Sequence, residues 1–129
     1  MHELSITQSL FELTLREAER AGAQRVARLD IRVGALTGIV ADSVRFYYEM
    51  LSKGTLAEGA QLHFERVLPV ARCRRCGAET PLHDPDGSEA RFAHAWLEAF
   101  AALTCPACHA DDFELVGGHD FALVSIDVE

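Results

Sequence analysis

Helical and strand-like spacings of apolar residues alternate along the first part of the chain. Between Ile6 and Ala18, apolar side chains recur every three to four residues, which predicts an amphipathic helix with a broad apolar face. Ser5 and Gln8 fit a capping box, so we expect the helix to begin at Ser5 after a short N-terminal arm. From Val26 to Leu36, apolar and charged residues alternate, which predicts a β-strand.

A second helix and two further strands follow. Asp42 is suited to cap a helix that ends near Ser52. Residues Gln61 to Val70 alternate again, and Pro69 should end their pairing because it has no amide hydrogen. The chain closes with a strand-like segment, Phe121 to Val128. These elements predict an α/β fold, a small mixed β-sheet with two helices on one face.

The segment between the second and the last predicted strand has a different pattern. Residues 82–88 are rich in turn formers, and a helix-like stretch follows near 89–103. We expect residues 1–68, completed by a C-terminal strand at 119–129, to form one domain. Residues 69–118 should form an inserted lobe, zinc-ribbon-like and built around four cysteines.

Composition narrows the possible functions. The chain has 129 residues, 49% of them hydrophobic, and a formal net charge of −8. An acidic chain is a poor nucleic-acid binder, because that affinity rests on Lys and Arg neutralising phosphates. No run of 18 apolar residues and no secretory signal is visible, so we expect a cytoplasmic protein without a membrane anchor.

The four cysteines form two C-x-x-C pairs, Cys73 with Cys76 and Cys105 with Cys108. Each pair can form a tight turn that directs two sulfur atoms at one point, which is typical of a structural zinc site. Two disulfides are a weaker interpretation, because cytosolic thiols stay reduced. A zinc ion with four cysteine ligands has no open position, and no catalytic motif is present, so we expect no enzyme.

Three other interpretations of the four cysteines are possible. The sequence from Cys105 to His109 matches the C-x-x-C-H haem motif, but that interpretation leaves Cys73 and Cys76 without a role. A rubredoxin-like iron site, in an electron-transfer protein, uses the same four thiolates and would be red rather than colourless. A zinc-ribbon adaptor without any nickel function is a third alternative.

The chain as a whole resembles the HypA/HybF family. The resemblance rests on the two C-x-x-C pairs, the short C-terminal strand and three local motifs, Met1-His2-Glu3, Gly54-Thr55 and Glu58-Gly59-Ala60. It implies a nickel metallochaperone for maturation of [NiFe] hydrogenase, with nickel at the N-terminus and structural zinc at the cysteines. It also implies two partners, a nickel-supplying GTPase and the hydrogenase large-subunit precursor. The protein itself would be a monomer or a homodimer.

The chemistry of the N-terminus agrees with this implication. The α-amine of Met1, the amide and imidazole nitrogens of His2 and the amide nitrogen of Glu3 could provide four nitrogen ligands. A planar set of nitrogens suits nickel(II) or copper(II). The Glu3 carboxylate would adjust the site or face solvent.

Two features lie outside this assignment. The family usually has a shorter interval between its cysteine pairs, so residues 82–103 look like an insertion whose position and role the sequence leaves open. The remaining histidines are expected to be solvated or, for His109 beside Cys108, at most a neighbour of the metal site. They are His63, His83, His94, His109 and His119.

Overall fold

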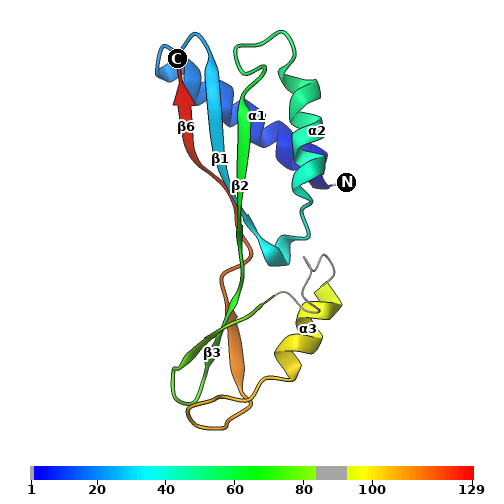
Figure 1. The fold of residues 1–129 in the computed structure, drawn as a ribbon, viewed down its shortest axis with the longest axis vertical. Helices are drawn as coiled ribbons and strands as arrows, with labels where there is room; N and C mark the ends of the chain where they lie inside the picture. The colour runs from blue at the N-terminus through cyan, green and yellow to red at the C-terminus, as the bar shows by residue number, and fades with distance from the viewer. Residues whose placement is uncertain (1, 84–92) are drawn as a thin grey trace. The chain divides into compact units, whose positions relative to one another are not determined.

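The computed structural model describes residues 2–83 and 93–129 (Figure 1). The chain divides into two compact units. The first consists of residues 1–32, 39–65 and 121–129, and the second of residues 33–38 and 66–120. Among the described residues, no helix has the length and apolar character needed to cross a membrane.

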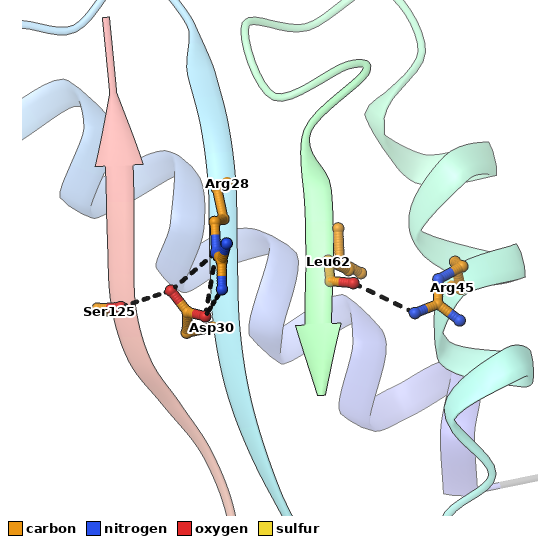
Figure 2. A network of polar contacts seen from close by, with 5 residues as sticks. All are labelled: Arg28, Asp30, Arg45, Leu62 and Ser125. Carbon is orange, nitrogen blue, oxygen red and sulfur yellow. Dashed lines mark hydrogen bonds and ion pairs between the residues drawn. The ribbon is translucent and has the colours of Figure 1, made fainter. Parts of the chain in front are cut away.

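The first unit is a three-stranded sheet with two helices. Its elements are α1 (His2–Arg20), β1 (Val26–Gly34), α2 (Ala41–Ser52), β2 (Gln61–Val67) and β6 (Phe121–Val128), and the strand order is β2-β1-β6. β6 runs antiparallel to β1, because the backbones of Arg25 and Glu129 exchange two hydrogen bonds of 3.1 and 2.8 Å. β2 runs opposite to β6 (Figure 2), so the sheet is mixed, as the sequence predicted.

The core of this unit lies between the sheet and the helices. Leu29 and Ile31 of β1 are buried, and α1 passes behind the strands to pack against α2 (Figure 1). The rings of Phe11 and Tyr48 meet edge to face at 6.1 Å. The Tyr48 hydroxyl donates to the Ala57 carbonyl at 2.8 Å, and burial raises the pKa of Tyr48 to about 12. Tyr48 therefore fixes α2 to the loop before β2.

Both helix starts differ from the expectation. α1 begins at His2, and the Thr7 hydroxyl donates to the Glu3 carbonyl four residues earlier, so the expected Ser5 cap is wrong. α2 is preceded by Val40 at its N-cap, and Asp42 lies in its first turn. Glu3 and Asp42 are the acidic residues of these first turns, where a carboxylate interacts favourably with the positive end of the helix dipole.

The second unit contains its own antiparallel sheet, which the sequence patterns did not predict. Its elements are a 3-10 turn η1 (Ala35–Thr37), β3 (Val70–Cys73), β4 (Glu79–Pro81), α3 (Ala93–Ala101) and β5 (Phe113–Val116). The central strand is β3, and Ala71 lies opposite both Thr80 of β4 and Leu115 of β5. The expected strand from Gln61 to Val70 is interrupted before Pro69, and β3 resumes one residue later.

The inserted helix belongs to the core of the second unit. Trp96 of α3 is buried at 3% exposure, in one cluster with Cys73, Cys105 and Phe113. The rings of Phe100 and Phe113 also meet edge to face at 6.4 Å. The helix between the two cysteine pairs is therefore an integral part of the packing around the cysteines. Residues 84–92, which include the start of the expected helix, lie outside the described residues.

This packing gives a first prediction. Trp96→Ala should destabilise the second unit by about 3–5 kcal/mol, because it removes a large buried side chain and leaves a cavity. Limited proteolysis and thermal unfolding followed by circular dichroism would measure the loss. Leu97→Ala is the matched control, since Leu97 is the next residue of the same helix and is 60% exposed. Equal stability of the two variants would contradict the assigned packing.

Candidate metal centre

The four cysteines lie together in the second unit. Their ligand atoms are all within 4.8 Å of one another, and none is in a disulfide. The sulfur–sulfur distance is 3.6 Å between Cys73 and Cys108 and also 3.6 Å between Cys76 and Cys105. A tetrahedral zinc ion with bonds of about 2.3 Å places its sulfur ligands about 3.8 Å apart. The spacing of these sulfur atoms therefore fits a tetrahedral zinc ion.

The two C-x-x-C turns have the same backbone hydrogen bonds. In the first turn, the Gly77 amide donates to the Cys73 carbonyl at 2.9 Å, and the Cys73 amide donates to the Ala78 carbonyl at 2.9 Å. In the second turn the corresponding bonds measure 2.9 Å from His109 to Cys105 and 2.8 Å from Cys105 to Ala110. β3 leads into the first turn and α3 precedes the second, so the two turns are held by different elements.

The backbone of each turn favours a thiolate on the first cysteine. Amide hydrogen bonds from Cys76, and then from Arg75, lower the pKa of Cys73. Those from Cys108 and Ala107 lower the pKa of Cys105 to about 6. Because Zn²⁺ binds thiolates rather than thiols, the same amides prepare both turns for a metal.

The second cysteine of the first turn behaves differently. The Ala78 amide lowers the pKa of Cys76, but thiol contacts with Cys105 and Cys73, together with desolvation, outweigh it and raise the pKa to about 12. A metal ion has to displace the proton of this thiol when it binds. Metal binding at the cluster is therefore coupled to proton release.

His109 occupies a special backbone position beside the cluster. Its φ of 64° makes it the one non-glycine residue with positive φ among those described, and the equivalent residue of the first turn is Gly77, with φ of 80°. The His109 side chain is exposed, and the cluster of four cysteines that could hold a metal ion does not include it. A left-handed conformation is tolerated by histidine less well than by glycine.

We expect His109→Gly to retain one zinc ion per chain and to stabilise the second unit by up to about 1 kcal/mol. The gain comes from relief of the left-handed strain, partly offset by the larger freedom of glycine in the unfolded chain. Thermal unfolding and zinc analysis are the measurements, and Gly77→Ala, which should lose about 1 kcal/mol, is the opposite control. Loss of zinc from His109→Gly would show that the imidazole participates in metal binding.

The N-terminal candidates belong to the first unit. Met1 lies outside the described residues, and His2 and Glu3 form the first turn of α1. Amides in the first turn of a helix have no carbonyl partner within the helix. The hydrogen bond from its own backbone amide is the largest of the interactions that lower the pKa of the Glu3 carboxyl.

Histidines outside the two candidate metal sites are described next to a polar network of the first unit. His63 and His119 are exposed, and His83 ends the described segment before residue 84. The sequence patterns did not identify the network in Figure 2, where the Arg28 guanidinium donates to Asp30 at 2.8 Å and the Ser125 hydroxyl donates to Asp30 at 2.9 Å. Arg28 and Asp30 both belong to β1, and the Ser125–Asp30 hydrogen bond joins β1 to β6, so only pairing of these strands could have revealed it.

Comparison with known proteins gives a consistent result over the whole chain. The family model described as "Hydrogenase/urease nickel incorporation, metallochaperone, hypA" matches residues 1–128. A hydrogenase maturation factor HypA from Dehalococcoides mccartyi is 35% identical over 129 residues, covering 100% of this chain and 95% of the relative. Another HypA, from Caldanaerobacter subterraneus, is 32% identical over 130 residues, and the alignment covers 100% of this chain and 100% of the relative.

Solved structures agree in fold. The solution structure of a HypA protein has a TM-score of 0.67 at 18% identity and covers 100% of this chain and 97% of its own. The solution structure of the Ni metallochaperone HypA from Helicobacter pylori has a TM-score of 0.58 at 16% identity. Its alignment covers 98% of this chain and 96% of the Helicobacter pylori chain. With the family match over nearly its entire length, this chain belongs to the HypA family, the metallochaperones of nickel incorporation into hydrogenase and urease.

Proposed function

We propose that this protein binds nickel(II) through Met1, His2 and Glu3 and delivers it during maturation of [NiFe] hydrogenase. Zinc held by Cys73, Cys76, Cys105 and Cys108 would stabilise the second unit. The observation that supports the proposal most strongly is the family match over residues 1–128, in a chain that carries both the N-terminal histidine and a four-cysteine cluster.

The start of α1 is a suitable place for a transferable metal ion. His2 and Glu3 contribute first-turn amides, which can lose their protons to a metal without breaking a helical hydrogen bond. Together with the α-amine and the imidazole they would form a planar nitrogen set, which suits nickel(II). A site at a helix terminus can also release its ion with a local change of backbone, because only the first turn must rearrange.

The zinc site would have a different role. Four thiolates leave zinc no open position, so the ion would supply structural stability rather than catalysis. The residues that would hold it connect the turn after β3 to the turn after α3 and adjoin the buried Trp96. Removal of the ion should therefore affect the packing of the whole second unit.

The partners and location follow from the proposed task. A metallochaperone of this kind would accept nickel from a GTPase and contact the large-subunit precursor of the hydrogenase. The family description also names urease, which makes a urease precursor an alternative client. A cytoplasmic location agrees with four cysteines that are free of disulfides.

Metal analysis of protein without any tag tests the proposal. Purified protein should contain one zinc ion per chain and should bind one nickel ion more when nickel(II) is added. Absorption spectroscopy should show colourless protein before that addition. Iron in stoichiometric amount, a red colour and a reversible one-electron wave would instead support the rubredoxin-like alternative.

A further inference from the structure

Two buried threonines of α1 make the same kind of hydrogen bond. Thr7 and Thr14 are both 0% exposed. Each hydroxyl donates to the backbone carbonyl four residues earlier, from Thr7 to Glu3 and from Thr14 to Leu10, and the second bond measures 2.8 Å. A buried hydroxyl needs a partner, and a carbonyl of the preceding turn is a common local partner for threonine in a helix. The two bonds have the same chemistry and differ in the part of α1 that they hold.

The acceptor of the Thr7 hydroxyl lies in the first turn. Glu3 is the second residue of α1, and the amides of a first turn have no carbonyl partner within the helix. Helix ends therefore fray more readily than helix interiors. Leu10 lies well inside α1, where regular hydrogen bonds on both sides already hold the backbone. The Thr7 hydroxyl thus adds a hydrogen bond where the backbone of α1 is least constrained.

Thr7 connects this end of the helix to the core. Its side chain is buried, whereas Glu3 is only half-buried and the neighbouring Leu4 and Ser5 are exposed. The carbonyl carbon and the amide nitrogen of Glu3 are bonded to the same Cα, so a hydrogen bond that fixes the carbonyl also limits movement of the nitrogen. Ligand atoms that are ordered before a metal arrives lose less conformational entropy when it binds.

We propose that Thr7 is a positioning residue of the nickel site. Its hydroxyl acts through the Glu3 carbonyl and holds the Glu3 amide nitrogen in place for the metal, and Thr7 itself does not contact the ion. This inference rests on the proposed nickel site at Met1, His2 and Glu3, and it adds a residue that lies outside the N-terminal motif.

Thr7→Val tests the proposal, because valine has nearly the shape of threonine and lacks the hydroxyl. The experiment uses the full chain without a tag and with its zinc site filled, and nickel(II) alone is titrated by calorimetry. We expect Thr7→Val to bind one nickel ion per chain with a dissociation constant about three- to tenfold higher, which is the effect of losing one hydrogen bond. Thr7→Ser retains a hydroxyl and should restore the affinity of the unchanged protein.

Thr14→Val is the matched control. It removes the same hydroxyl from an equally buried position about two turns further along α1. The midpoint of thermal unfolding should change by a similar amount in Thr7→Val and Thr14→Val, whereas nickel affinity should fall in Thr7→Val alone. A role of Thr7 in stability only would not produce this difference. Zinc content should be the same in all variants, because the cysteines belong to the second unit.

Weaker nickel binding that is confined to Thr7→Val and absent from Thr7→Ser and Thr14→Val supports the proposal. Unchanged affinity of Thr7→Val, equal weakening by Thr14→Val, or equal weakening by Thr7→Ser overturns it. Each of these three results leaves the nickel site itself intact, because the unchanged protein still binds nickel. Absence of nickel binding by the unchanged protein would instead refute the site and the role of Thr7 together.

Discussion

Cys73→Ala should lose its zinc and unfold the second unit while the first unit remains folded. The variant retains three sulfur ligands, and the buried position of Cys73 in the core becomes a cavity. Structural zinc contributes roughly 10–16 kcal/mol of apparent binding free energy in small zinc domains, far more than a core of this size can supply alone. The expected loss is therefore large compared with any single packing contact.

The structure offers a direct measurement of this loss. Trp96 is the only tryptophan of the chain and is buried against the cysteine cluster, so its fluorescence reports on the second unit alone. Its emission should shift to the red in Cys73→Ala, while the circular dichroism of the first unit's helices is retained. Arg75→Ala is the control, because Arg75 belongs to the same turn and is exposed. Stoichiometric zinc with unchanged fluorescence in Cys73→Ala would refute the four-cysteine assignment.

His2→Gln should abolish specific nickel binding and leave zinc unchanged. The variant removes the imidazole nitrogen, and the two proposed sites share no ligand and belong to different units. Isothermal titration with nickel(II), together with zinc analysis, measures both effects. His63→Gln is a matched control, since His63 is an exposed histidine of the same unit. Undiminished one-to-one nickel binding by His2→Gln would contradict the proposed site.

The same site predicts the effect of pH and of tags. The amine, the imidazole and the coordinating amides must all lose protons, so nickel affinity should fall as pH falls. An N-terminal tag converts the α-amine into an amide and should weaken binding, whereas a C-terminal tag should leave it unchanged. Four nitrogen ligands in a plane predict diamagnetic nickel(II). A paramagnetic, six-coordinate ion would indicate oxygen ligands in place of the backbone amides.

The sequence by itself determined the fold class and the family. Alternation from Val26 identified β1 and helical spacing from Ile6 identified α1, because burial of one face imposes these two periods. Spacing also predicted that the four cysteines would gather, since each C-x-x-C turn directs its own two sulfur atoms by local geometry. The family assignment confirms a metallochaperone rather than an enzyme. Each of these predictions used a local pattern of residues in the chain.

Only the tertiary structure decided the features that join distant segments. The helix starts predicted from the sequence were wrong. The capping pattern at Ser5 is a local signal, whereas α1 begins before it, at His2. The role of α3 depended on Trp96 reaching Cys73, and the left-handed φ of His109 depended on closure of its turn. The position of β6 at an edge of the sheet exists only once β6 has paired with β1. Which edge of a sheet remains free is set by strand order, and periodicity within one strand carries no information about its neighbours.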